Sequence, residues 1–500
     1  MASIGTFFGL NIGMNALDTM QQAESVVSNN IANASNPGYV QENTVISESG
    51  SFPSQPAQNA PIVAGQLGEG TMVTDVQRAV SPFLNQLVRN NLSQYQGQST
   101  LHASLSELQG IFGEPSSYGI QSALDAFAAA WQTLSTDPQS TAARTTVIQQ
   151  ASNLSNSTNM IQNQLQSWIN NNNSVIQGQV KIVNQYAQQI QSLNTQISQI
   201  EALSGSTGDG PSSSLTTSPN QLLDQRGQIL NELAKMGNIS YTQDSNGTVS
   251  VSFGGQAIVT GNSATLQPLD DTAQSPSAAL TSVASAVSSG SLTTGSMWAN
   301  QTASIAANQL LGQLTSLQSA IATAVNAQQG QGYPLNSSQQ NSNTPTIGGI
   351  ANPNYNPIFV TAANSTTPDI PLNVNSQLTP QQLGAASSAN APADGTNAVA
   401  MSQLFTSSTS SLASALGQAT PDTYFAGMMA ALGGQTSAAS NQEQVANSLL
   451  QQSQTQQQAV SGVNINEEAS KMVQFQSIYD AAAKFISVTN QMVATLIQEV

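Results

Sequence analysis

The sequence predicts a mainly α-helical fold. Paired N- and C-terminal coiled-coil helices carry a long helical-bundle stalk, and a β-rich or irregular side domain is inserted into that stalk. Three observations predict this architecture. Apolar residues recur at heptad spacing at both ends of the chain, the middle holds very long stretches of helical periodicity, and two stretches of different composition interrupt them. Because the two ends are expected to pair, everything between them is inserted outward.

The C-terminal helix is expected from Ile465 to the end of the chain, a stretch without Pro or Gly. One heptad row comprises Ile465, Met472, Tyr479, Ile486, Val493 and Val500, and a second comprises Phe475, Ala482, Thr489 and Leu496. Two such rows form an a/d seam typical of a coiled coil. A lone helix in water could not cover this apolar stripe, so the helix needs a partner.

The expected intramolecular partner is an N-terminal helix. Leu10, Leu17 and Ile31 fall on one heptad row of it, and Met20 and Val27 fall on another. The helix ends at Asn36-Pro37-Gly38, because Pro and Gly cannot continue it.

An antiparallel arrangement of these two helices predicts one ion pair. With Leu10 opposite Val493, Asp18 falls near Lys484. An exposed pair of this kind would contribute no more than about 1 kcal/mol.

Between the ends, periodicity and turn signals divide the chain further. We expect an extended connector at 45–70, a strand at 71–80, helices at 82–109, 119–135, 141–203, 219–237 and 298–328, and further helices from about 395. A hairpin is expected around Asn246-Gly247. The predicted domains are a terminal coiled-coil assembly domain (1–44 and 462–500), a helical stalk (45–236, 298–329 and 396–461) and an inserted domain (237–297 and 330–395).

Composition excludes several classes of function. Charged residues make up 7% of the chain and the net charge is −17, so a phosphate backbone would repel the protein and nucleic-acid binding is not expected. The absence of cysteine excludes disulfides and thiolate metal sites. No apolar run is long enough for a membrane span, and no basic segment of a cleaved signal peptide precedes Arg78.

Chemistry-bearing motifs are equally scarce. Asn466-Glu467-Glu468 reads better as a helix start than as an acidic pair, because Asn caps helices and first-turn acids favour the helix dipole. His102 is the single histidine, which leaves no second residue for a metal site and no base for a nucleophile. We therefore predict no catalytic, cofactor-binding or metal-binding residues.

Four segments carry a resemblance to a known family. SNNIANASNPGY (Ser28 to Tyr39) and the tail from Gly462 to Ile497 resemble the terminal signatures of bacterial flagellar axial proteins. The middle segments, 112–154 and 219–237, are similar to the hook-associated members of that family, which occupy the junction between hook and filament. The chain departs from the family at Asn36, where Thr is usual, and at Ala482, where Asn is common.

The resemblance implies an extracellular structural subunit of the flagellum, exported through the flagellar type III channel and required for motility. Its implied partners are identical subunits, neighbouring hook, hook-associated or filament proteins, and an export chaperone on the C-terminal helix. No cofactor, nucleic acid or membrane is implied. Assembly contacts are expected at Leu10, Leu17, Met20, Val27, Asn29, Asn30, Ile31, Asn33, Pro37, Gly38, Tyr39, Ile465, Met472, Phe475, Tyr479, Ile486, Val493 and Leu496.

Two other functions stay open on the sequence. One is a secreted adhesin or effector that displays the inserted domain on a helical stalk. The other is an enzyme such as a hydrolase or muramidase, whose activity would have to depend on His102 or on the few acids.

Overall fold

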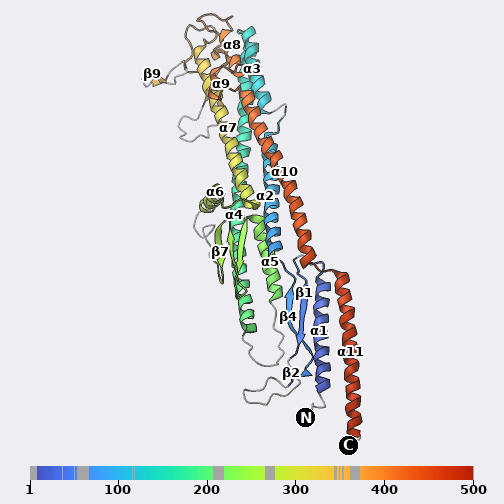
Figure 1. Cartoon of the computed structure of the whole chain (residues 1–500). Coiled ribbons are helices and arrows are strands. Elements are labelled where there is room, and N and C mark those ends of the chain that lie inside the picture. The colour runs from blue at the N-terminus through green and yellow to red at the C-terminus, as the bar shows by residue number, and fades with distance from the viewer. Residues whose placement is uncertain are drawn as a thin grey trace.

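The computed structural model shows an elongated molecule with both termini at one end (Figure 1). The structure describes residues 8–36, 38–49, 51–52, 67–114, 116, 119–205, 219–264, 276–342, 346–347, 350–351, 354–360 and 372–498. Helices dominate these ranges and the sheets are small, which confirms the predicted fold class.

The two terminal helices, α1 (Phe8–Asn33) and α11 (Ile465–Gln498), lie side by side as predicted (Figure 1). They run antiparallel, because α1 meets the later part of α11 near its own start and Glu468 near its end. A Cβ built on Gly13 would lie 2.5 Å from Ile486 Cγ1, so the two backbones approach closely there. This pairing buries apolar side chains that either helix alone would expose.

The register of the pair differs from the prediction. Gly9 faces Thr489 and Gly13 faces Ile486, which shifts the pairing by about one helical turn from the expected alignment of Leu10 with Val493. Asp18 accepts a hydrogen bond from its own helix neighbour Gln22, and no ion pair joins it to Lys484. The predicted pair is therefore wrong, because a heptad pattern alone permits more than one alignment.

A small antiparallel sheet lies beside α1. It pairs β1 (Glu42–Glu48) with β4 (Thr71–Arg78), and a second pair joins β2 (Ser51–Phe52) to β3 (Leu67–Gly68). β4 matches the predicted strand, whereas β1 falls partly in the predicted connector, of which residues 53–66 lie outside the described ranges. Thr19 donates to the Thr71 carbonyl at 2.7 Å, which attaches the sheet to α1.

Long helices form the stalk (Figure 1). They are α2 (Pro82–Phe112), α3 (Ile120–Thr136), α4 (Thr141–Gly205), α5 (Asn220–Met236), α7 (Gly295–Gln331) and α10 (Pro421–Ser461). The largest core cluster contains Phe127 and Trp131 of α3, packed edge to face. Ser81 caps α2 by accepting the Leu84 backbone N–H, and Pro82 occupies the first turn, where its missing N–H costs nothing.

The stretch after α5 folds as a four-stranded antiparallel meander against α4. Its strands are β5 (Ile239–Gln243), β6 (Val249–Phe253), β7 (Gln256–Thr260) and β8 (Ser263–Ala264). Gly247 turns the predicted hairpin with a φ of 77°, which suits glycine. A helix, α6 (Pro276–Ser288), follows in a stretch whose pattern was too weak to predict one.

The second inserted stretch lies at the far end of the stalk (Figure 1). It contains β9 (Thr346–Ile347), β10 (Ile350–Ala351), β11 (Phe359–Val360), β12 (Asn373–Val374) and the 3₁₀-helix η1 (Pro380–Gln382), followed by α8 (Thr396–Thr406) and α9 (Ser411–Ala415). Phe359 packs on Phe127, whereas Phe253 of the meander belongs to a separate core cluster. The structure thus places the stretches 237–297 and 330–395 against different parts of the stalk.

Candidate assembly interface

The face of α11 that contacts α1 is built from one heptad seam. Met472, Phe475, Ile486 and Val493 are half-buried along it, and Thr489 is buried. Two other expected contact residues lie at the margin of this face, since Ile465 is 54% exposed and Tyr479 is 37% exposed. The side chain of Leu496 lies outside the described residues.

A second apolar seam runs along α11 beside the first. Its members, spaced alternately by three and four positions, are Ile478, Ala481, Phe485, Val488 and Met492, and we call them the outer seam. Val488 is 47% exposed and Met492 is 56% exposed. Phe485 lies at the border between the two seams, because its ring also approaches Gly13. A helix with two adjacent seams can bind two partners at once.

α1 contributes a narrower apolar face. Met20 and Val27 are buried, and the predicted contacts Leu10, Leu17 and Ile31 are half-buried. The outer side of α1 is polar apart from Met14, which is 56% exposed. The free apolar surface of the terminal pair therefore lies mainly on α11.

A buried polar network joins the ends of the pair nearest the stalk. Asn30 and Glu468 are both 0% exposed, and the Asn30 amide nitrogen donates to Glu468 Oε2 at 2.7 Å. The same nitrogen donates to the Glu42 carbonyl at 2.8 Å, while Asn30 Oδ1 accepts from the Glu42 backbone N–H at 3.0 Å and from the Tyr39 hydroxyl at 2.7 Å. Asn30 thus uses its full hydrogen-bonding capacity, which offsets the cost of its burial.

Two further donors complete the shell around Glu468. Gln41 Nε2 and Lys471 Nζ donate to Glu468 Oε1 at 2.8 and 2.9 Å. Burial alone would lower the pKa of Lys471, but hydrogen bonds from its ammonium group to Glu468 and Glu467 raise it. Burial, followed by the nearby charges of Glu42, Asp224 and Glu468, raises the pKa of the Tyr39 phenol, so this hydroxyl remains a donor at physiological pH.

The rest of the N-terminal signature shapes the turn after α1. Asn33 donates to the carbonyl of Asn29 at 3.0 Å, and Asn29 itself is exposed. Gly38 has a φ of 91°, and a Cβ there would lie 2.6 Å from the Gln228 amide nitrogen of α5. The turn therefore needs glycine for both its backbone conformation and its close approach to the stalk. Pro37 lies outside the described residues.

Sequence reasoning missed the role of Glu468. It interpreted this residue as a first-turn acid, whereas the structure buries its carboxylate among three donors. One signal was available, because Glu468 precedes Phe475 by seven residues and therefore lies in the apolar row that faces α1. A charge in such a row requires polar partners from the facing helix.

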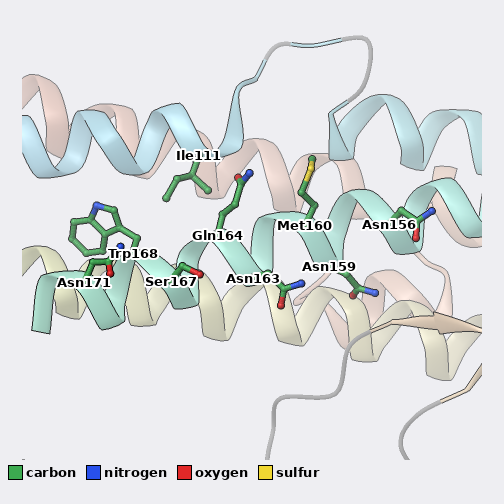
Figure 2. Close-up of a pocket in the computed structure, with 9 residues that line it drawn as sticks. All are labelled: Ile111, Asn156, Asn159, Met160, Asn163, Gln164, Ser167, Trp168 and Asn171. Carbon is green, nitrogen blue, oxygen red and sulfur yellow. The ribbon is translucent and has the colours of Figure 1, made fainter. Parts of the chain in front are cut away.

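Two other candidate sites lie in the stalk. His102 lies on α2 and its Nδ1 lies 2.8 Å from Glu443 Oε2 on α10, an isolated pair between two stalk helices. A groove of about 710 Å³ follows α4, and Figure 2 shows Trp168, Met160 and amide side chains along it. None of the side chains that line this groove titrates near neutral pH, so it offers no general acid or base.

The described residues hold no group of three or more His, Asp or Glu side chains arranged to bind a metal ion. None of the described helices has the length and apolar character required to cross a lipid bilayer.

Three family models match successive parts of the chain. The model described as flagellar hook-associated protein FlgK helical domain matches residues 105–343. The flagella basal body rod protein model matches residues 10–39, and the flagellar basal body rod FlgEFG protein C-terminal model matches residues 456–499. The two terminal matches cover the helices that form the antiparallel pair.

Individual relatives agree with these matches. The chain is 30% identical over 256 residues to flagellar hook-associated protein 1 of Salmonella typhimurium, covering 51% of this chain and 43% of that protein. It is 30% identical over 244 residues to flagellar hook-associated protein 1 of Bacillus subtilis, covering 48% and 45% of the two chains. The aligned part thus spans less than half the length of these relatives.

One solved structure shares the fold. The flagellar hook junction protein FlgK from Burkholderia pseudomallei superposes with a TM-score of 0.55 at 18% identity, covering 75% of this chain and 100% of that one. This similarity supports the helical architecture.

Proposed function

We propose that the chain belongs to the flagellar hook-associated protein 1 family and is a structural subunit of the bacterial flagellum that forms the junction between hook and filament. In this proposal the subunits assemble through their terminal helices, and the stalk and the inserted stretches lie outside those helices. The predicted domain boundaries, namely 1–44 with 462–500 for assembly, the stalk segments and the inserted segments, are part of the proposal.

The outer seam of α11 is the observation that carries the proposal. Four large side chains of this seam, Ile478, Phe485, Val488 and Met492, are 40–56% exposed although they follow coiled-coil spacing. Covering the exposed half of each side chain would contribute roughly 1 kcal/mol. A neighbouring subunit that covers the seam would supply the burial that the isolated chain lacks. The partners proposed are identical subunits and the adjoining hook, hook-associated or filament proteins.

Export and location follow from the same proposal. The subunit would leave the cell through the flagellar type III channel and act outside it. The exposed seam would be covered before export by a chaperone that binds α11 as a helix in a groove. The subunit would use no cofactor and perform no catalysis. The relatives are flagellar structural proteins, and no observation favours the adhesin or the hydrolase.

The test replaces the outer seam without touching the face that packs on α1. We expect the double variant Ile478→Ser and Val488→Ser to keep the helix content of the wild type but to give cells without normal filaments. Filament length by electron microscopy and spreading in soft agar are the measurements. The matched control replaces Met160 and Val175 of α4 with Ser, because these side chains are 52% and 51% exposed outside the terminal pair. Normal filaments in the seam variant, or in cells whose protein lacks residues 463–500, would contradict the proposal.

A further inference from the structure

Two segments of the chain cross between the terminal pair and the stalk, and both meet the turn after α1 at Gln41. The Gln41 backbone N–H donates to the carbonyl of Ser461, the last residue of α10, at 3.0 Å. The Gln41 carbonyl accepts the backbone N–H of Ala79, which follows β4, at 2.8 Å. We call Gln41, Ala79 and Ser461 the joint. It holds together the segment after α1, the end of β4 and the end of α10.

One side chain connects the joint to the terminal pair. The Gln41 amide, 8% exposed, donates to Glu468 Oε1, and Glu468 Oε2 accepts from Asn30 of α1. Glu468 lies on the first turn of α11, directly after residues 462–464 that link α10 to α11. This carboxylate therefore contacts both helices of the pair and the joint at once. Figure 1 shows α11 extending beyond the end of the stalk beside α1.

We infer that Glu468 is a positioning residue that fixes the angle between the terminal helix pair and the stalk. A buried carboxylate is retained only where donors replace its hydration, and the three donors here come from α1, from the joint and from α11 itself. Each donor can be satisfied only when the three segments keep one relative orientation. Pairing of α1 with α11 does not need the carboxylate, because the apolar seam holds them together.

This inference rests on the proposed function for its biological meaning. A ring of identical subunits requires every terminal pair to leave its stalk at the same angle, since symmetric copies make identical contacts. A subunit whose terminal pair moves freely would lose conformational entropy on joining the ring, which weakens its binding. Glu468 would reduce that cost by setting the angle in the free subunit.

Spin-label distances on the monomer test the inference, and the natural absence of cysteine allows label pairs to be introduced freely. Labels at Gln444 of α10 and Gln476 of α11 report the angle across the joint. Labels at Gln21 of α1 and Gln476 report the pair itself. All three positions are exposed. In the wild type we expect one narrow distance distribution for each label pair.

Glu468→Gln should cause loss of the narrow distribution across the joint and leave the distribution within the pair unchanged. The matched control is Glu467→Gln, which also removes a carboxylate bonded to Lys471 but an exposed one, and it should change neither distribution. A narrow, unshifted Gln444–Gln476 distribution in the Glu468→Gln variant would overturn the inference.

A second variant tests the inference if Glu468→Gln also broadens the Gln21–Gln476 distance distribution. Gln41→Ala removes the donor from the joint and leaves the bond between Asn30 and Glu468 intact. Broadening across the joint alone supports the inference, and an unchanged distribution overturns it. These measurements use free monomer, so they stand apart from assembly. Normal filaments in the outer-seam variant would contradict the proposed function without contradicting the positioning role of Glu468.

Discussion

Asn30 of α1 and Glu468 of α11 are 438 positions apart in the chain, yet the amide of the first donates to the carboxylate of the second at 2.7 Å. The bond lies within an otherwise apolar contact, where any unpaired polar group would be costly. It is satisfied on both sides, because Asn30 also bonds Tyr39 and Glu42 and Glu468 also bonds Gln41 and Lys471. The pairing of the two chain ends is thus specified by polar contacts as well as by apolar burial.

Replacing Asn30 with Ala should destabilise the pair near the stalk. The substitution removes one partner from the buried carboxylate and two from Glu42, so we expect a cost of about 2–4 kcal/mol in local opening free energy. Hydrogen exchange at the Glu42 amide measures this directly, since that N–H donates to Asn30 Oδ1. The control is Asn29→Ala, because Asn29 is exposed and both of its side-chain hydrogen bonds lie at the surface, one donated to the Tyr39 hydroxyl at 3.4 Å and one accepted from Asn33 Nδ2 at 2.8 Å. Equal protection of the Glu42 amide in both variants would contradict the expectation.

Two glycines on the same face of α1 should respond differently to alanine. A Cβ at Gly13 would lie 2.5 Å from Ile486 Cγ1, whereas a Cβ at Gly9 would lie 3.6 Å from its nearest neighbour in Thr489. Gly9→Ala should stabilise the pair by up to about 1 kcal/mol through helix propensity. Gly13→Ala should gain the same stabilisation from helix propensity, but overpacking against Ile486 should destabilise the pair by about 1–3 kcal/mol.

Thermal unfolding followed by a tryptophan-independent probe, such as far-UV ellipticity, would rank these variants. The matched rescue is Gly13→Ala combined with Ile486→Ala, which removes both crowding atoms, Cγ1 at 2.5 Å and Cδ1 at 3.2 Å from the new Cβ. Recovery of the Gly13→Ala loss by that second change would show that the close approach causes it. An equal gain in stability for both alanine variants would contradict the packed geometry.

The heptad pattern was enough to predict which helices pair and which side of α11 faces α1. Met472, Phe475 and Ile486 lie on that side as the periodicity indicates. It could not predict the register, because sliding one helix by about a turn still brings apolar residues together. The observed alignment places Gly13 against Ile486 and Asn30 against Glu468, and periodicity reveals neither contact.

The short strands and the joint were harder to predict for a related reason. β1 gains its partners from β4 and α1, and Gln41 matters only because Ala79 and Ser461 come to lie beside it. These neighbours are distant in the sequence, so the local pattern of residues does not predict them. The outer seam, by contrast, was present in the spacing of Ile478 and Val488, but exposure had to be known before it could be separated from the face that contacts α1.

The ion pair between Arg78 and Asp224 attaches β4 to α5. Replacing one of these side chains should destabilise the attachment more than replacing both. The side chains are 16% and 13% exposed. Burial raises the pKa of Asp224, and the Arg78 guanidinium partly opposes that rise. Arg78→Met alone should therefore destabilise the attachment by about 3 kcal/mol, because it strands a buried carboxylate.

The double variant Arg78→Met and Asp224→Leu supplies the control for that expectation. It leaves no buried charge behind, so the structure should recover much of the loss. Hydrogen exchange in β4 and α5 would measure both variants. A double variant that is less stable than Arg78→Met would contradict the expectation.

The stability of the segment before α8 should depend on pH, because the Asp394 carboxylate holds it through hydrogen bonds from Ser387 and Thr396. Burial alone would raise the pKa of this carboxyl, but hydrogen bonds from Thr396 and Ser387 outweigh it and hold the pKa well below the ordinary value of 3.8. A carboxyl with a lowered folded-state pKa stabilises the fold above its unfolded pKa and loses that contribution as pH falls through the folded one. Protection of the neighbouring backbone amides from hydrogen exchange should therefore weaken only below about pH 3.8.

The amides of Ser387 and Thr396 report this contribution, because they donate to the Asp394 carboxylate at 2.7 and 2.9 Å. Asp394→Asn should lower their opening free energy at pH 7 by about 1–2 kcal/mol and abolish its pH dependence. Asp125→Asn is the matched control, since burial, followed by the nearby Asp422 charge, raises the pKa of Asp125. Ionised Asp125 opposes folding, so its removal should leave stability unchanged or increased. If the amides of Asp394→Asn kept wild-type protection at pH 7, the carboxylate would not be what holds this segment in place.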